Sequence, residues 1–464
     1  MKKSNYISRR NFLKRLGAGA TTITAAAAVS ACGSKSDKIS ASASTKREIP
    51  LDKMTYRTNH NNSDRVSILG YGCMRWPMIP NPSGHGEIVN QESVNRLIDF
   101  ALEHGVNYFD TSPAYCQGYS EGATGEALSR YPREKYFIAT KLSNFAPSTW
   151  SRESSINMYH NSFKELRVDV IDYYLLHSIG NGGIETFNRR YVENGMIDYL
   201  MKEREAGRIR NLGFSFHGTK EVFDQVLAMH EQVHWDFVQI QLNYVDWRHA
   251  SGANVNADYL YAELTKRNIP AIVMEPLLGG RLSNVPEHIM MRLKQQRPDE
   301  SVASWAFRFA GSHENVLTVL SGMTYMEHLQ DNLLTYSPLI PLNEQDYVFL
   351  EETAQLMLQY PTIPCNDCKY CMPCPYGIDI PGVLLHYNKC VNEGNVSRSS
   401  QDENYRKARR AFLIGYDRSV PRLRQADHCI GCGQCNEHCP QSIDIPAEMQ
   451  RINNFVEQLK QQTL

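Results

Sequence analysis

The chain has 464 residues, of which 42% are hydrophobic and 21% are charged, and its formal net charge is -1. This composition is typical of a globular protein without a strong electrostatic field, which excludes a dedicated nucleic-acid binder or a binder of acidic polymers. Once a signal-like N-terminus and a cysteine-rich C-terminus are set aside, roughly 300 residues remain, enough for one large α/β domain.

The N-terminal segment has the features of an export signal. Residues 8–14 read SRRNFLK, a twin-arginine pattern, and a weakly apolar stretch rich in Ala, Gly and Thr follows over residues 16–31. That stretch is too short and too polar for a membrane-spanning helix. Residues 29–33 resemble a lipoprotein box, in which Cys32 would carry a lipid anchor. We predict a signal peptide over residues 1–32, a flexible tether over 33–50, and a periplasmic or membrane-surface lipoprotein.

The middle of the chain alternates strand-like and helix-like segments. Eight short segments are apolar and rich in β-branched or aromatic residues, as expected for strands buried on both faces. They are 66–70, 107–111, 136–140, 171–176, 211–215, 237–242, 271–274 and 316–320. Amphipathic segments lie between them; 94–102 carries apolar residues on one helical face, and Gly105 follows it as a C-cap. Eight strand–helix units predict a (β/α)8 TIM barrel over residues 51–342, with a doubly wound open sheet as the alternative.

Four chemically active residues follow successive predicted strands. They are Asp110 and Tyr115 in FDTSPAY, Lys141 in ATK, and His177 in YLLH. In kind and in order they resemble the catalytic tetrad of the aldo-keto reductases, and the resemblance covers roughly residues 54 to 335. With the C-terminal cysteines, the chain resembles the iron-sulfur branch of that family. The resemblance implies an oxidoreductase that interconverts a carbonyl and an alcohol.

The same four residue types suit carbonyl reduction on chemical grounds. A carbonyl that receives a hydride needs a proton donor at the developing alkoxide, and a tyrosine with a pKa of about 10 needs help to act as one. A lysine beside Tyr115 would lower the pKa of the phenol, and Asp110 would hold Lys141 charged. His177 would orient the substrate oxygen by hydrogen bonding.

The resemblance also implies a nicotinamide cofactor, NAD or NADP. Ser215 and Gln239 match the polar positions that hold its amide, but Met274 or Glu275 stands where the family usually stacks a tyrosine on the ring. A segment after the last predicted strand resembles the adenosine-phosphate site through Gly322, Met323, His328, Asp331 and Asn332. His328 stands where an arginine often contacts the extra phosphate of NADP. The preference between NAD and NADP therefore stays open, and a flavin is not excluded.

Two cysteine runs follow the barrel segment. They read Cys365-x2-Cys368-x2-Cys371-x2-Cys374-Pro375 and Cys429-x2-Cys432-x2-Cys435-x3-Cys439-Pro440. This is the bacterial ferredoxin arrangement, in which the fourth cysteine of each run binds the other cluster, with one residue fewer before Cys374. We predict one 4Fe-4S cluster on Cys365, Cys368, Cys371 and Cys439, and a second on Cys429, Cys432, Cys435 and Cys374. Structural zinc and disulfides are the alternatives.

The remainder of the C-terminal segment predicts a mainly α-helical, ferredoxin-like domain over residues 343–464. Residues 344–360 read as the linking helix and residues 405–414 as a helix within the domain. Arginines and lysines are frequent between positions 406 and 424. Such a run is usually a solvated face, and docking to an acidic redox partner is the alternative.

Taken together, these segments predict an exported oxidoreductase that relays electrons between its substrate and a redox partner protein or a quinone-linked system. A twin-arginine route exports folded proteins, which suits cofactors inserted in the cytoplasm. A freely exchanging NAD(P)H pool is not expected outside the cytoplasm, so we hypothesise a nucleotide that is bound before export and recycled through the clusters. Residues 178–188 and 244–256 suit a polar or sugar-like substrate. A docking or electron-transfer subunit on a barrel scaffold, with little catalysis of its own, is the alternative.

Overall fold

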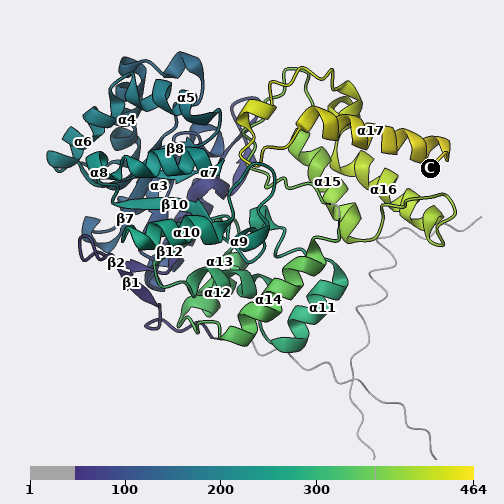
Figure 1. Ribbon diagram of the computed structural model, residues 1–464, viewed down its shortest axis with the longest axis horizontal. Helices are drawn as coiled ribbons and strands as arrows, with labels where there is room; N and C mark the ends of the chain where they lie inside the picture. Colours follow the sequence, from purple (N-terminus) through teal and green to yellow (C-terminus); the bar gives the residue numbers. More distant parts are fainter. Residues whose placement is uncertain (1–47, 361) are drawn as a thin grey trace, which may run out of the picture. The chain divides into compact units, whose positions relative to one another are not determined.

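A closed barrel of eight parallel strands forms the middle of the chain in the computed structural model, which describes residues 48–360 and 362–464 (Figure 1). Each strand pairs with its neighbours in the chain, and the last pairs with the first. This confirms the predicted TIM barrel against the open sheet. The strands are β3 (Leu69–Gly72), β6 (Tyr108–Asp110), β7 (Phe137–Leu142), β8 (Ile171–Ile179), β9 (Ile209–Phe216), β10 (Phe237–Gln241), β11 (Ala271–Met274) and β12 (Val316–Ser321).

The strands are apolar because most of them are buried on both faces. Every residue of β8 is buried, and large aromatic side chains such as Tyr108, Tyr173 and Phe237 fill the barrel interior. A second and larger apolar cluster lies between the strands and the surrounding helices. The apolar clusters inside and outside the closed sheet hold the strands in place. They thereby position the side chains at the C-terminal mouth of the barrel.

Helices follow the strands and cover the barrel. In α2, the Asn90 side chain caps the first turn by accepting from the Ser93 amide, and Val94, Leu97 and Ile98 face the core. The barrel helices are α2 (Gln91–Glu103), α3 (Ser120–Leu128), α4 (Arg152–Leu166), α5 (Gly183–Phe187), α6 (Met196–Glu205), α7 (Lys220–Ala228), α8 (His230–Val233), α9 (Asp246–His249), α10 (Ala257–Lys266), α11 (Glu287–Gln296), α12 (Val302–Gly311), α13 (Met326–Tyr336) and α14 (Glu344–Met357).

The first strand of the barrel differs from its predicted bounds. Val66 belongs to a short antiparallel hairpin, β1 (Tyr56–Thr58) and β2 (Arg65–Ser67), which precedes the barrel strand β3. Val66 is buried among the side chains of the barrel interior, so its apolar character reflects a cap on the barrel rather than a strand of it. A second hairpin, β4 (Met78–Pro80) and β5 (Glu87–Val89), follows β3.

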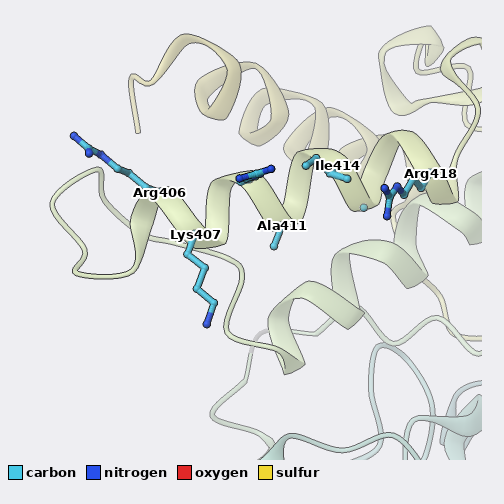
Figure 2. Close-up of a pocket in the computed structure, with 7 residues that line it drawn as sticks. Arg406, Lys407, Ala411, Ile414 and Arg418 are labelled. Carbon is cyan, nitrogen blue, oxygen red and sulfur yellow. The ribbon is translucent and has the colours of Figure 1, made fainter. Parts of the chain in front are cut away.

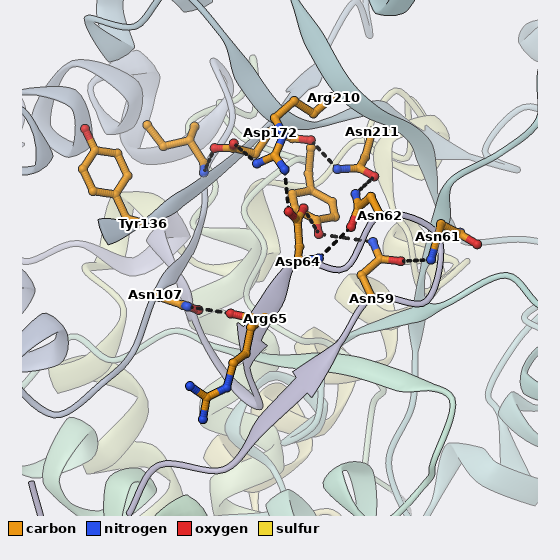
Figure 3. Close-up of polar contacts among 12 residues, drawn as sticks. Asn59, Asn61, Asn62, Asp64, Arg65, Asn107, Tyr136, Asp172, Arg210 and Asn211 are labelled. Carbon is orange, nitrogen blue, oxygen red and sulfur yellow. Dashed lines mark hydrogen bonds and ion pairs between the residues drawn. The ribbon is translucent and has the colours of Figure 1, made fainter. Parts of the chain in front are cut away.

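A polar network at the N-terminal ends of the strands fastens the first hairpin (Figure 3). The Arg210 guanidinium bonds Asp64 at 2.5 Å and Asp172 at 3.0 Å, and the Tyr173 hydroxyl donates to Asp64 at 3.1 Å. Asn62 in the hairpin turn donates to Asn211 of β9 at 2.7 Å. Since barrel chemistry lies at the opposite end of the strands, this network serves stability.

The C-terminal segment forms a helical layer of its own, which Figure 1 shows in light green and yellow. Its helices α15 (Ile380–Asn392), α16 (Tyr405–Ser419) and α17 (Ile445–Gln461) enclose a separate apolar cluster that includes Val383, Phe412 and Ile452. The predicted helix at 405–414 is thus confirmed and extends to Ser419. In contrast, α14 contributes Leu350 and Ala354 to the apolar cluster of the barrel.

Residues 48–464 belong to one compact unit. Among the described helices, none combines the length and the apolar character that crossing a bilayer requires. The predicted export signal, with Cys32, and most of the predicted tether lie outside the described residues. Those assignments therefore stay predictions.

Candidate active site

A buried ion pair lies at the C-terminal end of neighbouring strands β6 and β7. The Lys141 ammonium is 2.6 Å from Asp110 Oδ1 and donates at 2.8 Å to the Thr111 carbonyl. The Lys141 side chain is fully buried, and that of Asp110 nearly so. Burial raises the pKa of Asp110 and lowers that of Lys141, and the attraction between the two charges opposes both shifts. The second carboxylate oxygen, Asp110 Oδ2, has no partner among the described residues.

Tyr115 lies on a short turn that follows β6. Its side chain is 7% exposed, and the Lys141 ammonium is 4.8 Å from the centre of its ring. Burial raises the pKa of Tyr115 well above its usual value, and the neighbouring Tyr370 and Asp110 raise it further. We expected Lys141 to lower this pKa. The ammonium instead lies near the ring and is engaged by Asp110 and Thr111, so the Tyr115 phenol stays protonated and can serve as a proton donor.

His177 lies on β8 with its ring edge towards Tyr115, at 5.8 Å between ring centres. Its Nδ1 is 2.6 Å from the Ser143 hydroxyl and 3.4 Å from the Ser112 hydroxyl. Burial lowers the pKa of His177 well below its usual value, so the imidazole is neutral. When the Ser143 hydroxyl donates to Nδ1, the ring proton is on Nε2, which faces Tyr370.

The four predicted tetrad residues therefore come together at the mouth of the barrel. Sequence reasoning missed the two serines that hold His177. The available signal was their position, since Ser112 and Ser143 each follow a barrel strand by one or two residues.

Tyr370 also reaches this site, from the C-terminal segment. Its hydroxyl is 3.3 Å from His177 Nε2 and lies beside Tyr115, whose pKa it helps to raise. Its ring packs against Phe145 at 5.4 Å between centres. Tyr370 lies between Cys368 and Cys371 in the first cysteine run. Sequence reasoning missed this residue, because nothing local indicates that a tyrosine between two cluster cysteines reaches the barrel.

The segment around Tyr370, residues 365–371, is called here the first-cluster loop, and it makes further contacts across the mouth. Arg75, just after β3, bonds Asp367 at 3.1 Å and the Asn366 carbonyl at 2.8 Å. Asn366 donates at 3.0 Å to the carboxylate of Glu275, which follows β11. A side chain at Gly279 would collide with the Asn366 backbone at 2.3 Å, so only glycine allows this close approach. The first-cluster loop thus spans the ends of β3, β8 and β11.

Only some of the residues predicted to bind the nicotinamide suit that role. Ser215 and Gln239 are direct partners on the paired strands β9 and β10, and Gln239 Oε1 is buried with no partner among the described residues. That orphaned oxygen fits the amide of a nicotinamide. The stacking position falls on Met274 or Glu275, neither of which has an aromatic ring, and Asn366 and the Gly279 amide hold the Glu275 carboxylate. The residues therefore fit the amide end of the cofactor and offer its ring no aromatic surface there.

The predicted adenosine-phosphate residues gather near β12 and α13. Asn332 donates at 2.9 Å to Ser321, and Asp331 accepts at 2.6 Å from Ser301, the N-cap of α12. The Met323 carbonyl accepts from Tyr71, and Gly322 lies against the Arg75 side chain. His328 is exposed. Three of these five residues are thus engaged within the protein, while His328 is accessible to a phosphate.

The cysteines of the two runs lie close to one another, and their partition between two clusters stays a prediction. Burial, and then the charges of Cys439, Cys371 and Cys365, raise the pKa of Cys368 well above its usual value. In the other run, burial and the charges of Cys429, Cys432 and Cys374 raise the pKa of Cys435 to about 11. Burial and the charges of Cys365, Cys439 and Cys435 raise the pKa of Cys371 to about 12, so the two predicted sets also lie near each other.

The alternatives for the cysteines fit less well. All cysteines in the described part of the chain are free, which opposes the disulfide alternative. Within the same residues, no three His, Cys, Asp or Glu side chains form a group that could hold a single ion. Two runs of four cysteines, each followed by a proline, suit cubane clusters, in which each thiolate binds a different iron.

Comparison with known proteins agrees with this geometry. Residues 69–354 match the model of the aldo/keto reductase family, so the chain belongs to that family of NAD(P)-dependent oxidoreductases. Residues 364–444 match the 4Fe-4S dicluster domain, which makes it an aldo/keto reductase with a ferredoxin domain at its C-terminus.

Individual relatives match the barrel. L-galactose dehydrogenase from Arabidopsis thaliana is 24% identical over 323 residues, covering 66% of this chain and 95% of its own. NADH-specific methylglyoxal reductase from Escherichia coli (strain K12) is 27% identical over 331 residues, which cover 63% of this chain and 96% of the reductase. Among solved structures, the holo form of aldo-keto reductase AKR11C1 from Bacillus halodurans superposes with a TM-score of 0.52 at 22% identity, covering 65% and 96%, and shows the same fold.

Proposed function

We propose that this protein interconverts a carbonyl and an alcohol at Asp110, Tyr115, Lys141 and His177, and exchanges electrons with a redox partner through two 4Fe-4S clusters. One observation carries the proposal: the protonated phenol of Tyr115 and the neutral imidazole of His177 converge at a barrel mouth that the first-cluster loop covers. Tyr370, which lies between two proposed cluster ligands in the chain, thus contacts the site of carbonyl chemistry.

The chain's own residues supply the proton and the oxygen site of this reaction. A substrate carbonyl oxygen would accept hydrogen bonds from Tyr115 and from His177 Nε2, and Tyr115 would give up its proton as the alcohol forms. Lys141, paired with Asp110, would hold the Tyr115 ring in place, since its ammonium lies 4.8 Å from the ring centre. A bound nicotinamide would supply the hydride that adds to the carbonyl carbon.

The surface near the second cluster supports the exchange of electrons with a partner. Cys432 is exposed, and Ile430 and Leu423 are 64% and 79% exposed. The end of α16 packs beside this region, since the Ala426 amide donates to the Tyr416 hydroxyl at 3.0 Å. A cluster with an exposed ligand suits transfer to another protein, while the first cluster suits transfer to the barrel.

A basic groove on α16 indicates the charge of that partner. The groove encloses about 710 Å³ and is lined by Arg406, Lys407, Arg410, Ala411, Ile414, Gly415 and Arg418 (Figure 2). Its four cations are exposed, and no acidic side chain in the described part of the chain forms an ion pair with them. Positive potential steers encounters with acidic proteins, so the proposed partner presents an acidic face.

The proposed location is extracytoplasmic, with a lipid anchor at Cys32. The twin-arginine pattern supports it, and so does the need to insert clusters before export. Outside the cytoplasm a nucleotide would be retained rather than exchanged. Each hydride that it gives up equals two electrons and one proton, and the two clusters would return the electrons one at a time. Fractionation of cells, followed by mass spectrometry of the membrane-bound N-terminus, tests this; protein recovered from the cytoplasm with an intact N-terminus would contradict it.

The substrate class is a small polyhydroxylated or α-oxo carbonyl compound. Similarity to enzymes named for L-galactose and methylglyoxal supports this choice. Anaerobically purified protein should turn over members of a panel that contains L-galactose, D-arabinose and methylglyoxal.

Replacement of Tyr115 by Phe tests the catalytic proposal. The variant should lose about 100- to 10,000-fold in carbonyl turnover, because the proton donor is removed, while its clusters are reduced at the normal rate. Tyr119→Phe is the matched control, since Tyr119 is 46% exposed on the same turn. Equal turnover in Tyr115→Phe and the wild type, with intact electron transfer, would favour the scaffold alternative instead.

A further inference from the structure

We propose that the Tyr370 hydroxyl takes the place of the substrate oxygen in the resting protein, and that substrate binding displaces Tyr370 together with the first-cluster loop. The inference rests on the proposed function, because it takes Tyr115 and His177 as the groups that bind the substrate oxygen. It adds a residue of the ferredoxin domain to the active site and couples substrate binding to the first cluster.

The hydrogen bond between Tyr370 and His177 defines the position of the Tyr370 oxygen. The hydroxyl is 3.3 Å from His177 Nε2 and lies beside the Tyr115 phenol, whose pKa it helps to raise. A carbonyl oxygen that undergoes reduction needs these same two groups, one to orient it and one to protonate it. Two oxygens cannot occupy one such position. Tyr370 therefore acts as an internal ligand of the oxygen site and competes with the substrate.

The packing of Tyr370 allows it to leave. Its side chain is only partly buried, whereas Tyr115 and His177 are 7% and 4% exposed. The ring rests on Phe145 and His177, at 5.4 Å and 6.1 Å between centres, without an ion pair or a buried apolar cluster around it. A hydrogen bond from a substrate oxygen to His177 can replace the one that Tyr370 makes.

The backbone of Tyr370 links this displacement to the first cluster. Tyr370 lies between the proposed cluster ligands Cys368 and Cys371 in the chain, so its amide is placed to donate a hydrogen bond to a cluster sulfur. Hydrogen bonds to the sulfurs are among the factors that set the reduction potential of an iron-sulfur cluster. Withdrawal of the Tyr370 side chain changes the backbone around that bond. Substrate binding then alters the potential of the first cluster, and by linkage the cluster's oxidation state alters substrate affinity by the same factor.

The first experiment needs no substrate. Full-length, cluster-loaded protein is titrated anaerobically while the reduced first cluster is followed by electron paramagnetic resonance. The proteins are wild type, Tyr370→Phe, His177→Ala and the double variant, with Tyr376→Phe as a matched control, because Tyr376 lies just beyond the first-cluster loop and is 45% exposed. Tyr370→Phe and His177→Ala each break the same Tyr370–His177 contact. We therefore expect each change to shift the first-cluster potential, and the double variant to shift it no further than a single change does. Additive shifts, or none, would overturn the inference.

The second experiment measures binding of methylglyoxal by calorimetry and its effect on the same spectrum. Tyr370→Phe lacks the competing hydroxyl, so it should bind roughly 2- to 10-fold more tightly than wild type, and Tyr376→Phe should bind as wild type does. Saturation should shift the first-cluster potential in wild type and leave it nearly unchanged in Tyr370→Phe. Equal or weaker binding by Tyr370→Phe would overturn the inference.

The two experiments separate this inference from the proposed function. Carbonyl binding together with additive potential shifts leaves the proposed function intact and rejects the role of Tyr370. Failure of methylglyoxal, L-galactose and D-arabinose to bind either protein rejects both, because no substrate oxygen then competes with Tyr370. Loss of turnover in Tyr370→Phe at unchanged binding would assign the phenol to the chemical step and overturn its role as a displaced ligand.

Discussion

The buried pair of Asp110 and Lys141 provides a direct test of the site's electrostatics through Asp110→Asn. The change keeps the size of the side chain but removes its charge, which leaves the fully buried Lys141 ammonium with the Thr111 carbonyl as its remaining partner. Breaking one partner of a buried ion pair costs about 3–5 kcal/mol. For a barrel of this size, we expect the melting temperature to fall by roughly 10 °C.

The loss should also depend on pH in a defined direction. Burial lowers the pKa of Lys141 in the folded protein, and removal of Asp110 lowers it further. The folded state then binds fewer protons than the unfolded state, so the unfolding free energy of Asp110→Asn rises with pH. The rise begins at the depressed pKa of Lys141 and ends near the ordinary lysine value of about 10.4.

Tryptophan fluorescence can follow the barrel during unfolding, because all five tryptophans lie within it. Asp99→Asn is the control, since the Asp99–Arg130 pair is 43% and 39% exposed and its loss should cost less than about 1 kcal/mol. The charge-neutral double variant Asp110→Asn/Lys141→Met should recover most of the stability. The reasoning is refuted if Asp110→Asn costs less than about 1 kcal/mol, or if the double variant is no more stable than the single one.

Three further predictions concern the clusters, the core and the partner surface. Cys439→Ser should abolish the spectrum of the first cluster and Cys374→Ser that of the second; loss of the opposite cluster in each would refute the crossed partition. Burial raises the pKa of Glu121 to about 7, so the folded state binds the extra proton and stability falls as pH rises from about 4.5 to 7. Glu121→Gln should remove that fall in the free energy of unfolding, which is roughly 3 kcal/mol by pH 8. Chemical denaturation at several pH values measures it, and an unchanged pH dependence in the variant would show that another group causes the fall. Replacing the four cations of the basic groove with Glu should slow reduction by an acidic ferredoxin at least tenfold at low salt. Stopped-flow rates that change neither with these substitutions nor with salt concentration would exclude the groove as the docking face.

The sequence predicted the barrel well because its strands are short, apolar and buried on both faces, a pattern that the chain repeats eight times. The tetrad could be predicted because each member follows a strand, and parallel strands bring their carboxyl ends to one mouth. The first barrel strand begins at Leu69 rather than at Val66, which shows the limit of this reasoning. Val66 is apolar because it caps the barrel interior, and a burial pattern does not distinguish a cap from a strand.

The remaining features of the site depend on contacts between residues that are far apart in the chain. Tyr370 is 193 residues from His177, and Asn366 is 91 residues from Glu275. Neither contact produces a local sequence pattern, because each depends on a partner residue that is distant in the chain. The pKa of Tyr115 could not be predicted either. Its direction depends on where the Lys141 ammonium lies relative to the ring, which residue type alone does not determine.

The position of the first-cluster loop has a consequence for the order of events during synthesis. Ribosomes deliver the barrel first, and domains generally fold as their residues emerge. The barrel mouth, however, also receives Asn366, Tyr370 and Gln441, the last of which donates at 3.0 Å to Gln241. The barrel can therefore close its sheet early in translation, but its mouth is complete only when almost the whole chain has been made.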